Sequence, residues 1–314
     1  MIALLAASLA AEPGWLVLET DHHRIVYPAE ASEFTEHLAA RLDAIREAVE
    51  LEVGNRVRTR TEIVVHDPYS LPSGEAYPIG RRPRMDLWAH APTADDELGF
   101  YGSFDVVLAA HEDAHVVHAL RAPRNVTGRV LFESFGIAPI LRKSPPWVLE
   151  GYATVVEGRV TGSGRPHGAW RATMLRRMAQ DGTLPSYGAL SGRWRYIVAS
   201  AFLEWLDARE GGDSLKRVWA RLAARERRTV EGAFAGVYGA RLPELYARFT
   251  AELTADAMRS DGSAWRRETA ILRLQGPTRG MSLSPDGSRL AVARSDGEGV
   301  VELVVVGVRP DERA

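Results

Sequence analysis

The sequence predicts an α+β fold with an N-terminal mixed sheet lobe, a C-terminal helical lobe and a short all-β segment after them. The first observation is that apolar and polar residues alternate loosely from Trp15 to Pro28, as they do in strands. The second is that apolar residues recur at three- and four-residue spacing from Phe104 onward, as they do in helices. Because strands come first and helices later, the order argues against a doubly wound fold.

The N-terminal elements follow from local patterns. Trp15–Pro28 reads as a strand pair broken at residues 21–23. Ser32–Val53 carries apolar residues at helical spacing, and Thr61–His66 returns to strand character. One further strand is expected at Met85–Ala89, inside a stretch rich in Pro, Gly and Arg. These elements make up the predicted sheet lobe.

Helices are expected through the rest of the body, because the apolar spacing of three and four residues persists there. The predicted helices cover residues 104–120, 146–158, 169–181, 195–209, 213–225, 229–237 and 242–259.

The chain divides into three parts. Residues 1–11 form a short apolar run ending in small residues, which is typical of a signal peptide, although the run lacks a basic start; the alternative is an ordinary N-terminal segment. Residues 12–262 form the main domain. Residues 263–314 contain strand-like runs around a Ser284-Pro285-Asp286-Gly287 turn, which resembles the repeat of Tol-type β-propellers and implies a partial propeller blade.

Composition excludes several classes of protein and of site. Among 314 residues, 39 are Lys or Arg and 41 are Asp or Glu, a net charge of −2 that gives no reason to expect a nucleic-acid or anionic-membrane partner. No run is long enough to predict an integral membrane span. The chain has no cysteine, so disulfides and thiolate metal sites are excluded, and any metal must be held by His and carboxylates.

The motif that carries chemistry is His111-Glu112-Asp113-Ala114-His115. On a helix with about 100° per residue, positions 111 and 115 lie about 40° apart on one face. This spacing suits two ligands of one tetrahedral zinc, while Glu112 can reach a water molecule without binding the metal. Asp113 points about 200° away from His111, so we expect it on the surface.

A zinc site that catalyses hydrolysis needs a third protein ligand and an open position for water. The candidate is Glu150, 35 residues after His115 in the run Pro145-Pro146-Trp147-Val148-Leu149-Glu150-Gly151. Prolines suit the first turn of a helix, where amides have no partner in the helix. A conventional alternative for Glu150 is a solvated helix carboxylate.

These motifs resemble the gluzincin zinc metallopeptidases, the thermolysin-like clan, and in particular the bacterial type followed by a Tol-type propeller. The resemblance covers roughly Trp15 to Met258. It implies one Zn²⁺ per chain bound by His111, His115 and Glu150, with Glu112 as the general base, in a cleft between the two lobes.

The resemblance also suggests further site residues. Tyr196 is expected to stabilise the oxyanion, with Tyr152 and His167 as alternatives, or else to be a packed core aromatic. His118 shares the ligand face but would block the water position, so it is expected beside the ligands. Thr154 stands where relatives have an Asp that supports a ligand, and Glu157 is the alternative support. His22 and His23 are expected to be solvated.

The expected substrate is a peptide or protein, held by an edge strand for which Met85–Ala89 is the best candidate. Because no methionine stands in the Gly-x-Met-x-Asn context of the clan's aminopeptidases, an endopeptidase or an unknown cleavage mode is expected. The alternatives are a non-catalytic scaffold or binding module of the cell envelope, and a zinc hydrolase of non-peptide substrates. The expected location is periplasmic or extracellular, with the cytoplasm as the alternative; the sequence leaves the oligomeric state undetermined.

Overall fold

The computed structural model describes residues 14–67, 71–79, 82–90, 92, 102–136, 138–260, 278–295 and 301–308. Residue contacts divide the chain into two compact units, Met1–Arg259 and Ser260–Ala314. The predicted signal peptide and the predicted boundary at residues 262–263 both lie outside the described residues. Among the helices that are described, none is long and apolar enough to cross a membrane.

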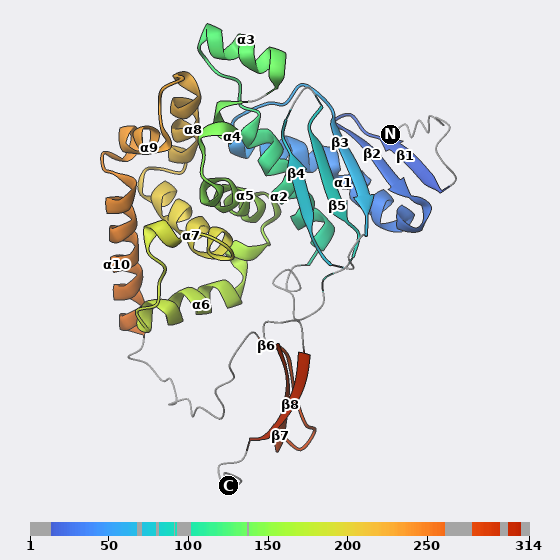
Figure 1. Ribbon diagram of the computed structural model, residues 1–314, viewed down its shortest axis with the longest axis vertical. Coiled ribbons are helices and arrows are strands. Elements are labelled where there is room, and N and C mark those ends of the chain that lie inside the picture. The colour runs from blue at the N-terminus through green and yellow to red at the C-terminus, as the bar shows by residue number, and fades with distance from the viewer. Residues whose placement is uncertain are drawn as a thin grey trace. The chain divides into compact units, whose positions relative to one another are not determined.

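The first unit begins with a five-stranded mixed sheet (Figure 1). Its strand order is β1-β2-β3-β5-β4. The two inner pairs, β2–β3 and β3–β5, are parallel, whereas β1–β2 and β5–β4 are antiparallel. The strands are β1 (Trp15–Glu19), β2 (His23–Pro28), β3 (Thr61–His66), β4 (Gly74–Tyr77) and β5 (Arg84–Trp88).

Helix α1 (Ser32–Val53) connects the parallel strands β2 and β3 and lies against the sheet. Residues along β2 and β3 alternate between buried and half-buried, so each strand turns one face toward the core. Gly54 ends α1 at a φ of 69°, a left-handed conformation that glycine adopts without the strain of a side chain. The helix thus buries the apolar face of the sheet.

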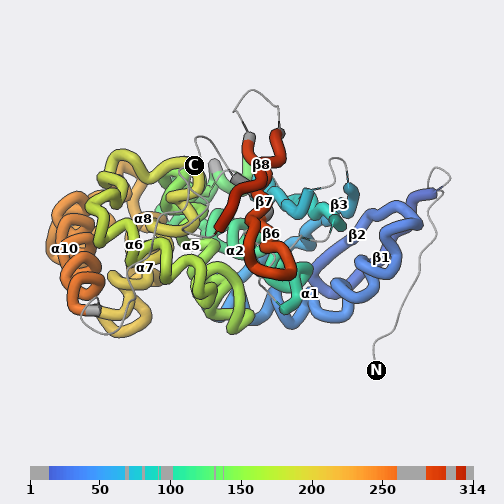
Figure 2. The backbone as a smooth tube through the Cα atoms, turned by 90° about the horizontal axis from the view of Figure 1, so that it is seen from below, coloured from blue at the N-terminus to red at the C-terminus, as the bar shows by residue number. Residues whose placement is uncertain are grey.

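The rest of the unit is helical. Figures 1 and 2 show the sheet on one side of this unit and most of the helices on the other, with α2 between them. The helices are α2 (Phe104–Ala119), α3 (Val126–Phe135), α4 (Pro139–Lys143), α5 (Pro146–Thr161), α6 (Ala169–Gln180), α7 (Trp194–Arg209), α8 (Ser214–Ala224), α9 (Val230–Tyr238) and α10 (Leu242–Ser260), with single turns η1 (Ala29–Ala31), η2 (Arg165–His167) and η3 (Tyr187–Ala189).

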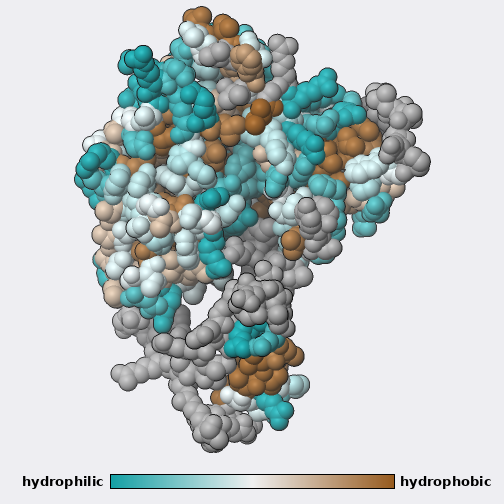
Figure 3. All heavy atoms as spheres, in the orientation of Figure 1, coloured by the Kyte–Doolittle hydropathy of each residue, from teal (hydrophilic) through white to brown (hydrophobic). Residues whose placement is uncertain are grey.

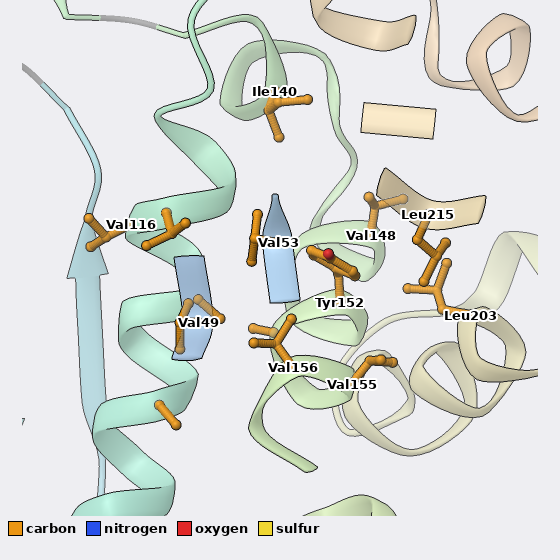
Figure 4. Packing of buried hydrophobic residues seen from close by; sticks show 14 of the residues in the cluster. Val49, Val53, Val116, Ile140, Val148, Tyr152, Val155, Val156, Leu203 and Leu215 are labelled. Carbon is orange, nitrogen blue, oxygen red and sulfur yellow. The ribbon is translucent and has the colours of Figure 1, made fainter. Parts of the chain in front are cut away.

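Helices α2, α5 and α7 pack in series and form the centre of the core. Figure 4 shows Val49 and Val53 of α1 beside Val116 of α2, and the side chains of α5 reaching Leu203 of α7. A β-carbon on Gly151 of α5 would lie only 3.1 Å from the β-carbon of Ala199 of α7. The missing side chain therefore lets α5 and α7 approach closely.

The predicted order, a mixed sheet followed by helices, is confirmed. The sequence patterns did not predict β4, α3 or α4. They were also wrong about the edge strand, because Met85–Ala89 falls on β5, which pairs with β3 on one side and β4 on the other. The sheet edge next to the helices is β4.

The second unit contains a three-stranded antiparallel sheet of β6 (Thr278–Leu283), β7 (Arg289–Ser295) and β8 (Val301–Gly307). Gly287 takes a φ of 70° in the turn between β6 and β7, and Asp286 accepts a hydrogen bond from the Ser288 amide at 3.1 Å. The predicted hairpin is present. The described residues give three strands, and these do not establish the predicted propeller blade.

Candidate metal centre

Two helices bring three metal-binding side chains together. His111 and His115 lie one turn apart on α2, and Glu150 lies in the first turns of α5. Glu150 Oε2 is 3.5 Å from His111 Nε2 and 3.2 Å from His115 Nε2. Within the described residues this is the only group of three such side chains whose ligand atoms all lie within 4.8 Å of one another.

The donor atoms fit a single zinc ion. Zinc binds imidazole nitrogen and carboxylate oxygen at about 2.0 to 2.2 Å, so two ligands of a tetrahedral site are separated by about 3.4 Å. The two separations involving Glu150 are close to that value. Two imidazoles and one carboxylate also form a donor set that catalytic zinc sites use, with one position left open.

Glu157 fixes the orientation of His111. Its Oε2 lies 2.7 Å from His111 Nδ1, so the ring can donate a proton there and leave Nε2 for a metal. Burial favours the neutral ring, but the hydrogen bonds with Glu150 and Glu157 outweigh it and raise the pKa of His111 to about 9. A metal therefore has to displace a proton, which makes its affinity dependent on pH.

Arg165 in turn holds Glu157. Its backbone amide donates to Glu157 Oε1 at 2.8 Å, and its guanidinium donates to Oε2 at 2.7 Å. Burial would raise the pKa of Glu157, but the charge of Arg165 and the bond with His111 outweigh it and lower that pKa. Glu157 thus stays ionised although it is fully buried.

Glu112 lies beside the ligands and faces the edge strand. A β-carbon on Gly74 of β4 would come within 3.0 Å of Glu112 Cγ, so the strand passes directly over this side chain. Glu112 is only 5% exposed, and burial raises the pKa of its carboxyl group although the two histidines oppose this. A carboxylate with a raised pKa accepts a proton more readily than an exposed one.

Tyr196 of α7 contributes an aromatic hydroxyl to the same site. Its ring centre lies 6.0 Å from that of His111, and the Arg165 guanidinium lies 4.9 Å from its ring centre. Burial and the charge of Glu150 raise the pKa of Tyr196 to about 12. The hydroxyl therefore remains protonated at neutral pH and can donate a hydrogen bond.

These side chains line one cleft of about 570 Å³. One wall is the edge strand β4 with residues 72–73 and 78 beside it, and the opposite wall comes from α2, α5 and α7. Apolar side chains from α2, α4 and α5 complete the lining: Phe104, Val107, Leu108, Leu141 and Leu149.

Other predicted site residues lie elsewhere. His118 is buried between Tyr152 and Trp219, at 4.5 Å between ring centres in each case, so neither His118 nor Tyr152 reaches the cleft. Thr154 donates its hydroxyl hydrogen to the carbonyl oxygen of Glu150 at 2.9 Å and does not support a ligand side chain. His167 bonds to the Gly158 carbonyl oxygen and likewise lies outside the cleft lining.

Two surface predictions were wrong. Asp113 is 1% exposed and accepts hydrogen bonds from Arg46 of α1, one of them from Nε at 2.7 Å. His23 is fully buried and lies 3.3 Å from the Arg46 guanidinium. The helix face opposite the ligands packs against α1 rather than facing solvent, and helical periodicity alone does not show where that second layer lies.

The sequence patterns missed Arg165 and Gly74. Arg165 follows α5 in a single turn of 3₁₀ helix, and Gly74 belongs to a strand of only four residues. Neither position carries a periodic or spaced pattern, so no sequence feature pointed to them. The role of each follows from a tertiary contact, that of Arg165 with Glu157 and that of Gly74 with Glu112.

No family model matches the sequence. No curated protein matches it either. Similar solved structures include native yeast LTA4 hydrolase, with 12% identity and a TM-score of 0.44 over 76% of this chain and 38% of that one.

Two structures of a two-domain M1 zinc metallopeptidase mutant are also similar. The one bound to L-tryptophan has 11% identity and a TM-score of 0.40, covering 73% of this chain and 48% of its own. The one bound to L-arginine has 14% identity and a TM-score of 0.40, covering 74% and 48%. The chain spans less than half the length of each of the three structures. The fold and the candidate metal centre are therefore argued from the residues of this chain alone.

Proposed function

We propose that this protein hydrolyses peptide bonds with one zinc ion held by His111, His115 and Glu150. The observation that carries the proposal is the convergence of these three ligand atoms within 4.8 Å at a cleft, with Glu112 next to them. Zinc bound there supplies a Lewis acid that polarises a carbonyl group and makes a water molecule more acidic.

Glu112 is the proposed general base. It lines the cleft beside both histidines without belonging to the ligand cluster, so its carboxylate is free to take a proton from the attacking water. The same carboxyl group can then deliver that proton to the leaving amine. A non-catalytic scaffold would have no physical need for a buried carboxyl group at this position.

Tyr196 is the proposed oxyanion donor. Its protonated hydroxyl lines the cleft on the α7 side, where it can donate a hydrogen bond to the oxygen of the substrate carbonyl as negative charge develops. Arg165 lies over the Tyr196 ring and supports its position.

We infer a peptide substrate from the position of β4. This strand pairs only with β5 among the described strands, and it forms one wall of the cleft. An extended peptide can add to such an edge through its backbone. Its sequence, Gly74-Glu75-Ala76-Tyr77, lacks a Gly-x-Met-x-Asn pattern, which supports an endopeptidase. Export of the protein and a propeller after residue 262 stay predictions.

The first experiment measures zinc content by elemental analysis in wild type, Glu150→Ala and Glu112→Gln, together with cleavage of an unstructured protein such as casein. Wild type is expected to hold about one zinc per chain and Glu150→Ala to lose it. Glu112→Gln is expected to keep zinc and fold while cleavage falls by about 10² to 10⁴-fold, since general acid–base catalysis is worth about that much.

Glu47→Gln is the matched control, because Glu47 is exposed on α1 and the change is chemically the same. Wild type without zinc, even after zinc is supplied, would support the scaffold alternative. Zinc retained in Glu150→Ala would mean that the third ligand is a different residue. Full activity in Glu112→Gln would remove the proposed base.

A further inference from the structure

Helix α3 carries large apolar side chains that the proposed function does not use. Val126, Val130 and Phe135 are 77%, 56% and 66% exposed. The helix is well formed, since Asn125 accepts a hydrogen bond from the Gly128 amide at its start and Gly136 ends it in the left-handed region. Figure 3 shows apolar surface at the top of the molecule, where Figure 1 places α3. Val126 and Val130 lie about 40° apart on one face of α3, whereas Phe135 is about 180° from Val126. An exposed apolar face marks an interaction site.

Cationic side chains are frequent in the segment that carries this helix and in a second segment next to it. Residues 124–143 contain Arg124, Arg129, Arg142 and Lys143 against one carboxylate, and residues 225–228 contain three arginines against one carboxylate, Glu226, which pairs with Arg142. The two segments adjoin, because the Arg124 amide donates to the Ala223 carbonyl oxygen at 3.2 Å and Lys143 Nζ donates to the Arg225 carbonyl oxygen at 2.8 Å. Together they form what we term the basic apolar surface, residues 124–135, 142–143 and 225–228.

We propose that the basic apolar surface binds the face of an anionic phospholipid bilayer. Val126 and Val130, which lie about 40° apart on one face of α3, enter the boundary between headgroups and acyl chains, and the arginines contact headgroup phosphates. Guanidinium groups suit this role because they bind phosphate oxygens through paired N–H donors. The charges of the surface and of an anionic leaflet are complementary.

The combination of features selects a membrane over other polyanions. A nucleic-acid backbone would match the arginines but offers no apolar environment for the two exposed valines. Helix α3 is too short to cross a membrane, because it has 10 residues and a transmembrane helix needs about 20. The net charge of −2 for the whole chain conceals this surface, because seven of its 39 Lys and Arg residues are concentrated there.

The test is flotation of the full chain with large unilamellar vesicles at 0.1 M NaCl. Binding is expected to vesicles of phosphatidylcholine and phosphatidylglycerol (7:3) and not to phosphatidylcholine alone, with release at 0.5 M NaCl. The variant Arg225→Gln/Arg227→Gln/Arg228→Gln is expected to bind at least about tenfold more weakly. Val126→Ser/Val130→Ser is expected to lose binding with an unchanged melting temperature.

Two control variants test whether the place of the substituted residues matters, and not only their type. Arg176→Gln/Arg177→Gln/Arg248→Gln removes the same charge from α6 and α10, and Met258→Ser removes an exposed apolar side chain from α10. Both should bind as wild type does. Failure to float, equal binding to neutral vesicles, or equal loss in the controls overturns the proposal. Light scattering that shows a dimer lost in the α3 variant, without vesicle binding, would instead assign the surface to a second copy of the chain.

Discussion

His111 is contacted by two carboxylates from one helix. Glu150 and Glu157 are seven residues apart on α5, nearly two helical turns, so both face α2. Glu150 lies 3.5 Å from Nε2 of the ring and Glu157 lies 2.7 Å from Nδ1. One carboxylate therefore joins the ligand cluster while the other sets the ring orientation.

This division of roles predicts a change in zinc affinity. Glu157→Ala removes the acceptor of the Nδ1 proton and leaves the ring free to rotate, so zinc should bind about 10- to 100-fold more weakly. Competition with a chelator of known affinity measures the change. Thr154→Ala is the control on the same helix, since the Thr154 hydroxyl donates to a backbone carbonyl and not to a ligand side chain, and its zinc affinity should be unchanged. Equal affinities in wild type and Glu157→Ala would show that the ring is oriented by other groups.

At the scale of elements, the site depends on how closely β4 approaches α2. A four-residue strand brings Gly74 directly over Glu112, at a distance that leaves little room for a side chain. The same strand offers its backbone edge to the cleft. One short element thus positions the proposed base and borders the space that a peptide would occupy.

Gly74→Ala should therefore reduce turnover without removing zinc. The added carbon would lie 3.0 Å from both Glu112 Cγ and Leu108 Cδ1, so Glu112 must move by a few tenths of an ångström. We expect kcat to fall by about tenfold, because small misplacements of a catalytic group are costly. Zinc content and melting temperature should stay close to wild type.

Gly188→Ala is the matched control, since a β-carbon there meets no atom within 4 Å. It should leave kcat unchanged. A Gly74→Ala enzyme with wild-type kcat would mean that the strand does not restrain Glu112.

At the scale of the whole first unit, a buried polar network joins the sheet, α1 and the metal-binding helix. Arg46 of α1 donates to Asp113 of α2 and, at 2.8 Å, to Thr61 of β3, and it lies beside His23 of β2. Burial opposes ionisation of Asp113, but the charge of Arg46 outweighs it and lowers the pKa of Asp113 to about 2. The free energy of unfolding of this unit should therefore depend on pH.

The sign of that dependence follows from the lowered pKa. Asp113 stabilises the fold above its ordinary pKa of 3.8, and this contribution is lost as the pH falls through about 2. Asp113→Asn leaves the Arg46 charge buried without its partner, so the free energy of unfolding should fall by about 3 kcal/mol at pH 7. Urea unfolding in the presence of a chelator, between pH 7 and 2, measures it.

The difference between wild type and Asp113→Asn should shrink between about pH 4 and pH 2, as wild type loses the same charge. Asp21→Asn is the control, because Asp21 is an exposed carboxyl outside the buried network. A difference that stays constant over this range would show that the Asp113 charge does not contribute.

The sequence by itself determined the features that depend on local spacing. Two histidines one turn apart, a carboxylate at the start of a later helix and the periodicity of the main helices can all be read along the chain, because a helix repeats every 3.6 residues. The turn between β6 and β7 was likewise predicted from its Pro-Asp-Gly residues. These features needed no knowledge of which elements are neighbours.

Only the tertiary structure decided the features that depend on neighbours distant in sequence. It placed β4 rather than Met85–Ala89 at the sheet edge, and it covered Asp113 and His23 with Arg46. It also brought residues 225–228 next to Lys143 of the segment that carries α3. The burial and charge environment of a residue are set by the elements that pack against it. Here those elements bring in residues 67 or 82 positions away, and such contacts leave no pattern in the local sequence.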